Sequence, residues 1–141
     1  MKKFIFFIGN KKSQDLGLLI LRVGFGLLML PHGWAKWIKF DKLQTEFMDF
    51  MGLGPIISLC LVIFSEMICS TLLVLGLLTR WATIALIVTA LVILSAHNWD
   101  VFGESELGSA YLFAYIVILL LGPGKYSLDG LISSKKNVNR F

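Results

Sequence analysis

The sequence predicts an all-α membrane protein, a transmembrane four-helix bundle with a short amphipathic interfacial helix between its first and second spans. Of its 141 residues, 57% are hydrophobic and 16% charged, and the mean hydropathy is +0.80, which is typical of a polytopic membrane protein. Four apolar runs are separated by short polar segments. Each run approaches the roughly 20 residues that a helix needs to cross about 30 Å of hydrocarbon. The length allows one domain at most.

The first predicted span covers about residues 16–37 and reads LGLLILRVGFGLLMLPHGWAKW. Residues 1–15 precede it as an interfacial, cytoplasmic lead-in, because their apolar patch is too short for a signal peptide and lysines close it on both sides. Small residues spaced seven apart lie along one helix face and allow a neighbouring helix to approach closely. Two such glycine pairs occur in this span: Gly17 with Gly24, and Gly26 with Gly33.

The remainder of the membrane domain, which extends over 16–132, follows from alternating apolar and polar segments. Residues 40–54 are too polar to span, and their apolar positions recur at helical spacing, so they predict the amphipathic helix at the membrane surface. The other three spans are expected at about 55–78, 81–96 and 107–121, and a basic cytoplasmic tail at 133–141.

The distribution of basic residues predicts the orientation. Four spans place both termini on one side of the membrane. That side would collect most of the lysines and arginines, namely Lys2, Lys3, Lys11, Lys12, Arg80, Lys125, Lys135, Lys136 and Arg140. The opposite side has only Lys36, Lys39 and Lys42. The positive-inside rule therefore predicts a multi-pass protein of the bacterial inner membrane with both termini in the cytoplasm.

Two charged residues fall at similar depths inside the predicted bundle. Counting 1.5 Å per residue, Arg22 lies about 9 Å above the inner edge of the first span and Glu66 about 16 Å below the outer edge of the second. These depths permit contact, so we expect a buried Arg22–Glu66 ion pair. Such a pair either orients the helices as a structural lock or forms part of a site for a quinone-like or anionic ligand, or of a proton relay.

A second group of polar residues is expected at the outer face, where it would consist of His32, Trp34, Lys36, His97, Asn98 and Glu106. Two histidines and a carboxylate are able to bind a metal or to move protons. The histidines lack the spacing of a local metal motif, so we predict no metal site. The alternatives that remain are proton or headgroup binding and interfacial hydrogen bonding without chemistry.

The sequence lacks the motifs that are typical of several classes of enzyme. The chain has no glycine-rich phosphate loop, no serine nucleophile elbow and no haem-attachment motif. Cys60 and Cys69 lie nine apart in one predicted helix, too far apart for a disulfide. The net charge of +4 comes from residues that flank the apolar runs, which argues against nucleic acid as a partner. Catalytic residues stay unassigned.

Four segments in a fixed order carry a family resemblance: LRVGFGLLMLPHGWAKW (21–37), FSEMICSTLLVLGLLTRWATIAL (64–86), His97, and LLGPGKYSLDGLI (120–132). Together they resemble the DoxX family of small four-span bacterial membrane proteins. The resemblance implies a four-helix membrane fold with Arg22, His32-Gly33-Trp34, Glu66 and Arg80 at the family's polar positions. Relatives include subunits associated with a terminal quinol oxidase and with thiosulfate:quinone oxidoreductase, and most members have no established activity.

Three hypotheses for function follow. The first is an accessory subunit of a quinone-linked redox assembly in the membrane, which binds either quinone as a cofactor or a lipid near Arg22 and Glu66. Its partners would be the lipid bilayer and another protein of the complex. The second is a quinone-linked oxidoreductase in its own right. The third is a structural scaffold in an unrelated envelope complex. Substrate, electron donor, native partner and oligomeric state, including a homo-oligomer, are left open by the sequence.

Overall fold

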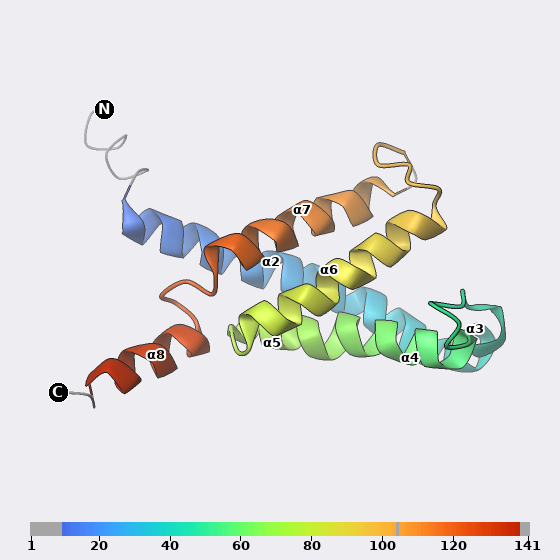
Figure 1. The fold of residues 1–141 in the computed structure, drawn as a ribbon, viewed down its shortest axis with the longest axis horizontal. Coiled ribbons are helices and arrows are strands. Elements are labelled where there is room, and N and C mark those ends of the chain that lie inside the picture. The colour runs from blue at the N-terminus through green and yellow to red at the C-terminus, as the bar shows by residue number, and fades with distance from the viewer. Residues whose placement is uncertain (1–9, 104, 139–141) are drawn as a thin grey trace.

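The computed structural model describes residues 10–103 and 105–138, and these residues form helices joined by turns (Figure 1). The first nine residues of the predicted lead-in, Glu104 and the last three residues of the predicted tail lie outside the described part. The helices are α2 (Lys11–Ile38), α3 (Phe40–Glu46), α4 (Pro55–Phe64), the π-helical turn η1 (Ser65–Cys69), α5 (Ser70–Leu75), α6 (Thr79–Ala96), α7 (Glu106–Leu121) and α8 (Leu128–Val138).

The helices run back and forth between two ends of the molecule. The start of α2, the turn between α5 and α6, and α8 lie at one end, while α3 and the loop between α6 and α7 lie at the other (Figure 1). α4, η1 and α5 follow one another without a break and form the second long helical segment. We call the first end the α8 end and the second the α3 end.

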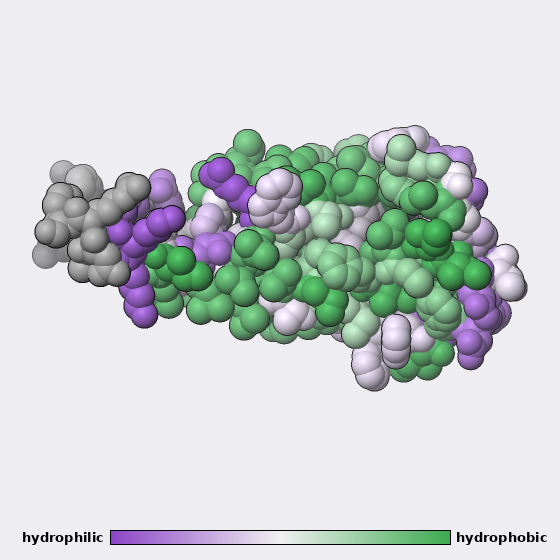
Figure 2. Space-filling view, turned by 60° about the horizontal axis from the view of Figure 1, so that its bottom comes forward, coloured by the Kyte–Doolittle hydropathy of each residue, from purple (hydrophilic) through white to green (hydrophobic). Residues whose placement is uncertain are grey.

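The apolar character of the helices agrees with a membrane protein. Three helical segments, Lys11–Ile38, Pro55–Leu75 and Thr79–Ala96, are long and apolar enough to cross a bilayer, and the apolar helix α7 is shorter. Figure 2 shows hydrophobic residues over the middle of one face and hydrophilic residues gathered at its two ends. The predicted class, an all-α membrane bundle, is confirmed. A crossing by α7 stays a prediction.

The core lies where the four apolar segments meet. α6 and α7 pack along each other, and α2 packs on η1 and α5. The largest buried side chains of the core cluster come from all four segments, so each element contributes to it. They are Met29, Leu73, Leu86, Tyr115 and Ile118.

Only one of the two predicted glycine faces is used in packing. A Cβ added to Gly26 would lie 2.6 Å from Val74 Cγ2, so this glycine permits the close approach of α2 to α5. Gly33 makes a similar approach to η1. Gly17 and Gly24, in contrast, have no atom within 4 Å of an added Cβ. The prediction of a second packing face was wrong because its glycines face away from the neighbouring helices.

The segments next to the bundle differ in extent from the sequence prediction. The predicted interfacial segment 40–54 contains the helix α3, which ends at Glu46, and continues as turns and extended backbone. The predicted tail 133–141 begins inside α8, a helix that starts at Leu128.

Candidate functional site

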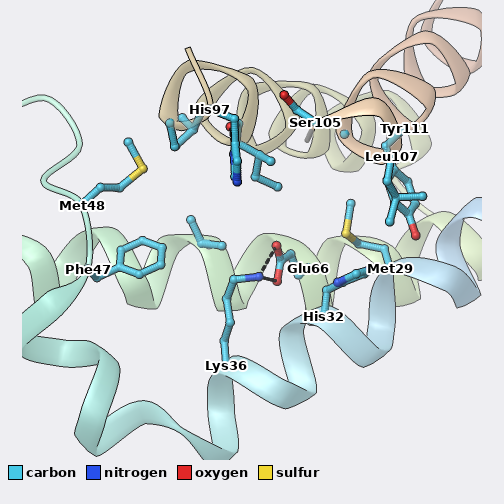
Figure 3. A pocket seen from close by; sticks show the side chains of 15 residues that line it. Met29, His32, Lys36, Phe47, Met48, Glu66, His97, Ser105, Leu107 and Tyr111 are labelled. Carbon is cyan, nitrogen blue, oxygen red and sulfur yellow. Dashed lines mark hydrogen bonds and ion pairs between the residues drawn. The ribbon is translucent and has the colours of Figure 1, made fainter. Parts of the chain in front are cut away.

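A cavity of about 340 Å³ lies between α2, α4 with η1, α6 and α7, toward the α3 end. Its walls are mostly apolar, and its polar groups come from different helices: His32 and Lys36 from α2, Glu66 from η1, and His97 from the end of α6. We call this the polar cavity. Its remaining lining residues are Met29, Phe47, Met48, Val62, Val92, Ile93, Ala96, Ser105, Leu107, Gly108 and Tyr111 (Figure 3).

An ion pair between Lys36 and Glu66 lies in the wall of this cavity. Lys36 Nζ donates to both carboxylate oxygens of Glu66, at 2.8 Å to Oε1 and 2.7 Å to Oε2. The Glu66 side chain is fully buried, whereas that of Lys36 is 23% exposed. Figure 3 shows the pair pointing into the space between the helices.

The prediction that Arg22 pairs with Glu66 was therefore wrong. Arg22 is also fully buried, but it donates to backbone carbonyls at the α8 end. The depth count failed because it ignored which residues of the two helices lie opposite each other: Gly33 of α2 lies against Glu66, whereas Arg22 lies beside Leu73. The signal available in the sequence was Gly33, which marks the contact with η1 and is three residues before Lys36.

Local backbone structure brings Glu66 and Lys36 together. Glu66 is part of the π-helical turn Ser65–Cys69, an irregularity that often occurs at functional positions in helices. A Cβ on Gly33 would lie 2.6 Å from Met67 Cγ and 3.0 Å from Glu66 Cβ, so only glycine lets α2 approach this turn so closely. Lys36, almost one helical turn further along α2, then reaches the carboxylate.

Aromatic rings extend the site toward the core. The His32 and Tyr111 rings have their centroids 6.0 Å apart at an interplanar angle of 90°, and Tyr111 stacks on Tyr115 with centroids 5.9 Å apart. His97 Nδ1 lies 2.9 Å from the Ile93 carbonyl oxygen, and its ring points toward the Lys36–Glu66 pair in Figure 3. The cavity thus combines an ion pair, two imidazoles and a phenol with apolar walls.

The predicted outer-face group is only partly assembled. His32, Lys36 and His97 line the polar cavity, whereas Trp34, Asn98 and Glu106 do not. Trp34 instead lines a groove between α2 and α4 with Trp37 and Cys60. Within residues 10–103 and 105–138, no three His, Cys, Asp or Glu side chains are grouped as metal ligands.

Sequence reasoning missed several cavity residues, above all Tyr111 and the pair Phe47 and Met48. Tyr111 is one polar ring in an apolar run, and nothing local shows which way it points. Phe47 falls within the predicted amphipathic helix over 40–54, but α3 ends at Glu46, and Phe47, with extended backbone, lines the cavity.

Arg22 lies at the centre of a second buried group, at the α8 end. Its Nη1 donates to the Leu73 carbonyl at 3.0 Å, and its Nη2 donates to the Tyr126 carbonyl at 2.6 Å. Arg22 thereby joins α2 to the end of α5 and to the segment before α8. These contacts use only the backbone of the other elements, and the side chain does not line the polar cavity.

Asp129 adds a further connection at the same end. Its carboxylate accepts hydrogen bonds from the backbone amides of Leu78, which directly precedes α6, at 3.0 Å and of Thr79, the first residue of α6, at 2.8 Å. Its own amide donates to the Gly76 carbonyl at 2.9 Å. We call Arg22, Gly76, Tyr126 and Asp129 with these contacts the backbone latch.

Comparison with known proteins agrees with this architecture. A family profile described as DoxX matches residues 17–99, which include Arg22, Lys36 and Glu66. The chain belongs to the DoxX family. The resemblance inferred from the sequence motifs is confirmed, and the matched range covers α2 from Gly17 onward and all of α3, α4, η1, α5 and α6.

Two relatives in Escherichia coli strain K12 extend the match over most of the chain. The inner membrane protein YqjF is 30% identical, and the alignment covers 89% of this chain and 98% of the relative. The inner membrane protein YphA is 27% identical over 83% of this chain and 91% of the relative. No solved structure matches the chain. This member of the DoxX family is thus an inner-membrane protein.

Proposed function

We propose that this DoxX-family protein is an accessory subunit of a quinone-linked redox assembly and that it binds a quinone headgroup in the polar cavity. The observation that carries the proposal is the Lys36–Glu66 ion pair in the wall of an otherwise apolar cavity of about 340 Å³. Small-molecule sites are typically concave and apolar, about 300–1,000 Å³ in volume, with a few converging polar groups.

The polar groups of the cavity suit a ring that carries carbonyl oxygens. Lys36 has three N–H donors, and its two hydrogen bonds to Glu66 leave one for a ligand. His32 and His97 provide two further ring nitrogens at the cavity surface. The apolar walls, including Met29 and Tyr111, would hold the faces of the ring. A bound quinone supplies the electron acceptor, and the role of the chain is to hold and orient it.

We also propose the orientation in which both termini are cytoplasmic. The α8 end carries the basic residues Lys11, Lys12, Arg80, Lys125, Lys135 and Lys136, against Lys36, Lys39 and Lys42 near the α3 end. The positive-inside rule favours the cytoplasm for the more basic end. The polar cavity would then open toward the outer half of the bilayer.

Quinone content of the purified protein tests the binding proposal. The protein is purified in a mild detergent from its native membrane, and quinone per chain is measured by mass spectrometry for wild type, Lys36→Met and Lys39→Met. Lys39 is the matched control, an exposed lysine at the end of the same helix that does not line the cavity. We expect near-stoichiometric quinone in wild type and Lys39→Met and at least a tenfold loss in Lys36→Met. Equal quinone in both variants would overturn the proposal.

The accessory role has a test of its own. Proteins that copurify with the chain after gentle solubilisation are identified, and quinone reduction is measured with and without them. We expect a redox enzyme to copurify and the isolated chain to be inactive. Quinone reduction by the isolated chain would instead make it an oxidoreductase, and copurification of envelope proteins without redox activity would make it a scaffold.

A further inference from the structure

A second cavity of about 260 Å³ adjoins the polar cavity. It lies between α4 and α6 beneath the segment that follows α3, and it shares Phe47, Met48, Val62 and Val92 with the polar cavity. We call it the apolar cavity. Its further lining residues are Phe50, Ser58, Leu61, Phe64, Ser65, Ala85, Val88 and Thr89.

The apolar cavity is accessible from the lipid. Three of its lining residues, Leu61, Phe64 and Val88, are 47%, 52% and 42% exposed. They belong to helices that are apolar enough to cross a bilayer, so their exposed sides face hydrocarbon chains. A hydrocarbon chain can enter between α4 and α6 without meeting a charged side chain.

One polar group in this cavity lacks a partner. The Ser65 hydroxyl is buried, with the residue only 3% exposed, and it makes no hydrogen bond within the described residues. Buried hydroxyls are normally hydrogen-bonded, and Ser65 directly precedes Glu66 in η1. Ser65 lines the apolar cavity and Glu66 lines the polar cavity, so neighbouring residues of η1 border the two spaces.

We infer that the apolar cavity binds the hydrocarbon tail of an amphiphile whose headgroup occupies the polar cavity. The inference rests on the proposed function and deepens it, because it specifies a tailed ligand that enters from the bilayer. Phe47, Met48, Val62 and Val92 line both cavities, so the two spaces lie directly beside each other. Phe47 and Met48 follow α3 and lie at the side of the polar cavity away from Tyr111 (Figure 3). Because both also line the apolar cavity, they would contact the ligand where tail and headgroup meet.

Affinity for two quinones that differ only in their tail tests this inference. The probes are 2,3-dimethoxy-5-methyl-1,4-benzoquinone and the same ring with a decyl chain. Binding to the full chain in detergent is followed by tryptophan fluorescence. The probe concentration is given as the molar ratio of probe to detergent, so that partitioning of the decyl compound into micelles is the same in every comparison. We expect wild type to bind the decyl compound at least tenfold more tightly. Ala85→Phe, which places a ring in the apolar cavity, should reduce this preference at least fivefold and change affinity for the tail-less quinone less than twofold.

A control and a second variant keep this test decisive. Ile84→Phe adds a similar ring at the neighbouring, lipid-exposed position outside both cavities and should behave as wild type. Val88→Phe obstructs the rim of the cavity and replaces Ala85→Phe if that variant does not fold. An unchanged tail preference in the folded variants overturns the inference, and the headgroup site then stands on its own.

Mass spectrometry of the same preparations separates failure of the tail site from failure of the quinone proposal. A prenyl quinone retained by wild type and lost from Ala85→Phe supports both. A phospholipid retained by wild type and lost from Ala85→Phe supports the tail site and overturns quinone as the ligand. Retention of the same molecule by wild type and by both cavity variants overturns the tail site.

Discussion

Glu66 and Arg22 are both fully buried charged side chains in the same membrane bundle, but their surroundings differ. Glu66 pairs with one side chain, Lys36, and the pair lies in the wall of a cavity. Arg22 donates to backbone carbonyls of two separate segments and lies outside that cavity. A buried charge that binds backbone groups on several elements holds those elements together, whereas a charge beside open space has room for a ligand.

Glycines at the α8 end and the α3 end also differ in how closely other side chains surround them. Gly76 in the backbone latch and Gly52 in the loop at the α3 end both have positive φ, +70° and +79°. A Cβ on Gly76 would overlap Arg22 Nη1 and lie 2.5 Å from Ser127 Cβ, whereas a Cβ on Gly52 would have no atom within 4 Å. Glycine is thus required for conformation at Gly52, and for both conformation and packing at Gly76.

Substitution of these glycines gives the largest expected effect. Gly76→Ala should lower the free energy of unfolding by roughly 3–5 kcal/mol, because the strain of a left-handed residue adds to overpacking against Arg22 and Ser127. Gly52→Ala, with the strain alone, should cost about 1–2 kcal/mol. Unfolding in mixed detergent micelles with increasing SDS, followed by circular dichroism, measures both. Equal losses would show that the latch tolerates displacement of Arg22.

Substitution of the two buried charges, Arg22 and Glu66, gives the next largest effect. We expect the Arg22 variant to lose more stability and the Glu66 variant to lose more quinone. Arg22→Met removes the guanidinium that donates to the Tyr126 carbonyl and one of the two donors to the Leu73 carbonyl, which keeps the Gly76 amide, and should cost about 1–3 kcal/mol of stability. Glu66→Gln should cost about 1 kcal/mol or less, because Lys36 is partly exposed and its ammonium group is able to reach water.

Quinone content completes this test. We expect folded Arg22→Met to retain quinone and Glu66→Gln to lose most of it, because the amide no longer fixes Lys36. Arg80→Met, which removes an exposed arginine near the latch, serves as the control for loss of positive charge at that end. If Arg22→Met lost quinone while Glu66→Gln kept it, the roles assigned to the two ends would be reversed.

The sequence was sufficient for the fold because the relevant signals are local. Apolar runs of membrane-spanning length and the ordered motifs around Arg22, Glu66 and Gly122-Pro123-Gly124 gave the bundle and the family. The partners of the buried charges were not predictable in the same way. They depend on which residues of two helices lie opposite each other, and depth alone did not distinguish Arg22 from Lys36 as the partner of Glu66.

The contacts of the backbone latch were not predictable from the sequence either. Asp129 lies in the family-like segment 120–132, but nothing in that segment indicates that its carboxylate binds the amides of Leu78 and Thr79, about 50 positions earlier. Tyr126 contributes only a backbone oxygen to Arg22, so its side-chain type carries no information about the contact. Any residue type provides a backbone carbonyl or amide, so contacts to backbone atoms cannot be predicted from the residue types that accept or donate them.

Asp129 provides the smallest expected effect, a dependence of stability on pH. Burial raises the pKa of the Asp129 carboxyl, but the hydrogen bonds from Thr79 and Leu78 and the charge of Arg22 together outweigh it, so the pKa lies below its ordinary value. A carboxyl with a lowered pKa in the folded state stabilises the protein above its unfolded-state pKa of about 4, and this contribution is lost as the pH falls through the folded-state pKa.

Wild type should therefore lose stability relative to Asp129→Asn as the pH falls below about 4, and the difference should be less than about 1 kcal/mol because the carboxyl is only partly buried. Asp41→Asn, at an exposed position of α3, is the control at the other end of the molecule and should follow the wild-type curve. Unfolding titrations at several pH values measure the differences. A constant gap between wild type and Asp129→Asn over this range would mean that the latch does not depend on the charge of Asp129, leaving Arg22 and its carbonyl contacts to hold the α8 end.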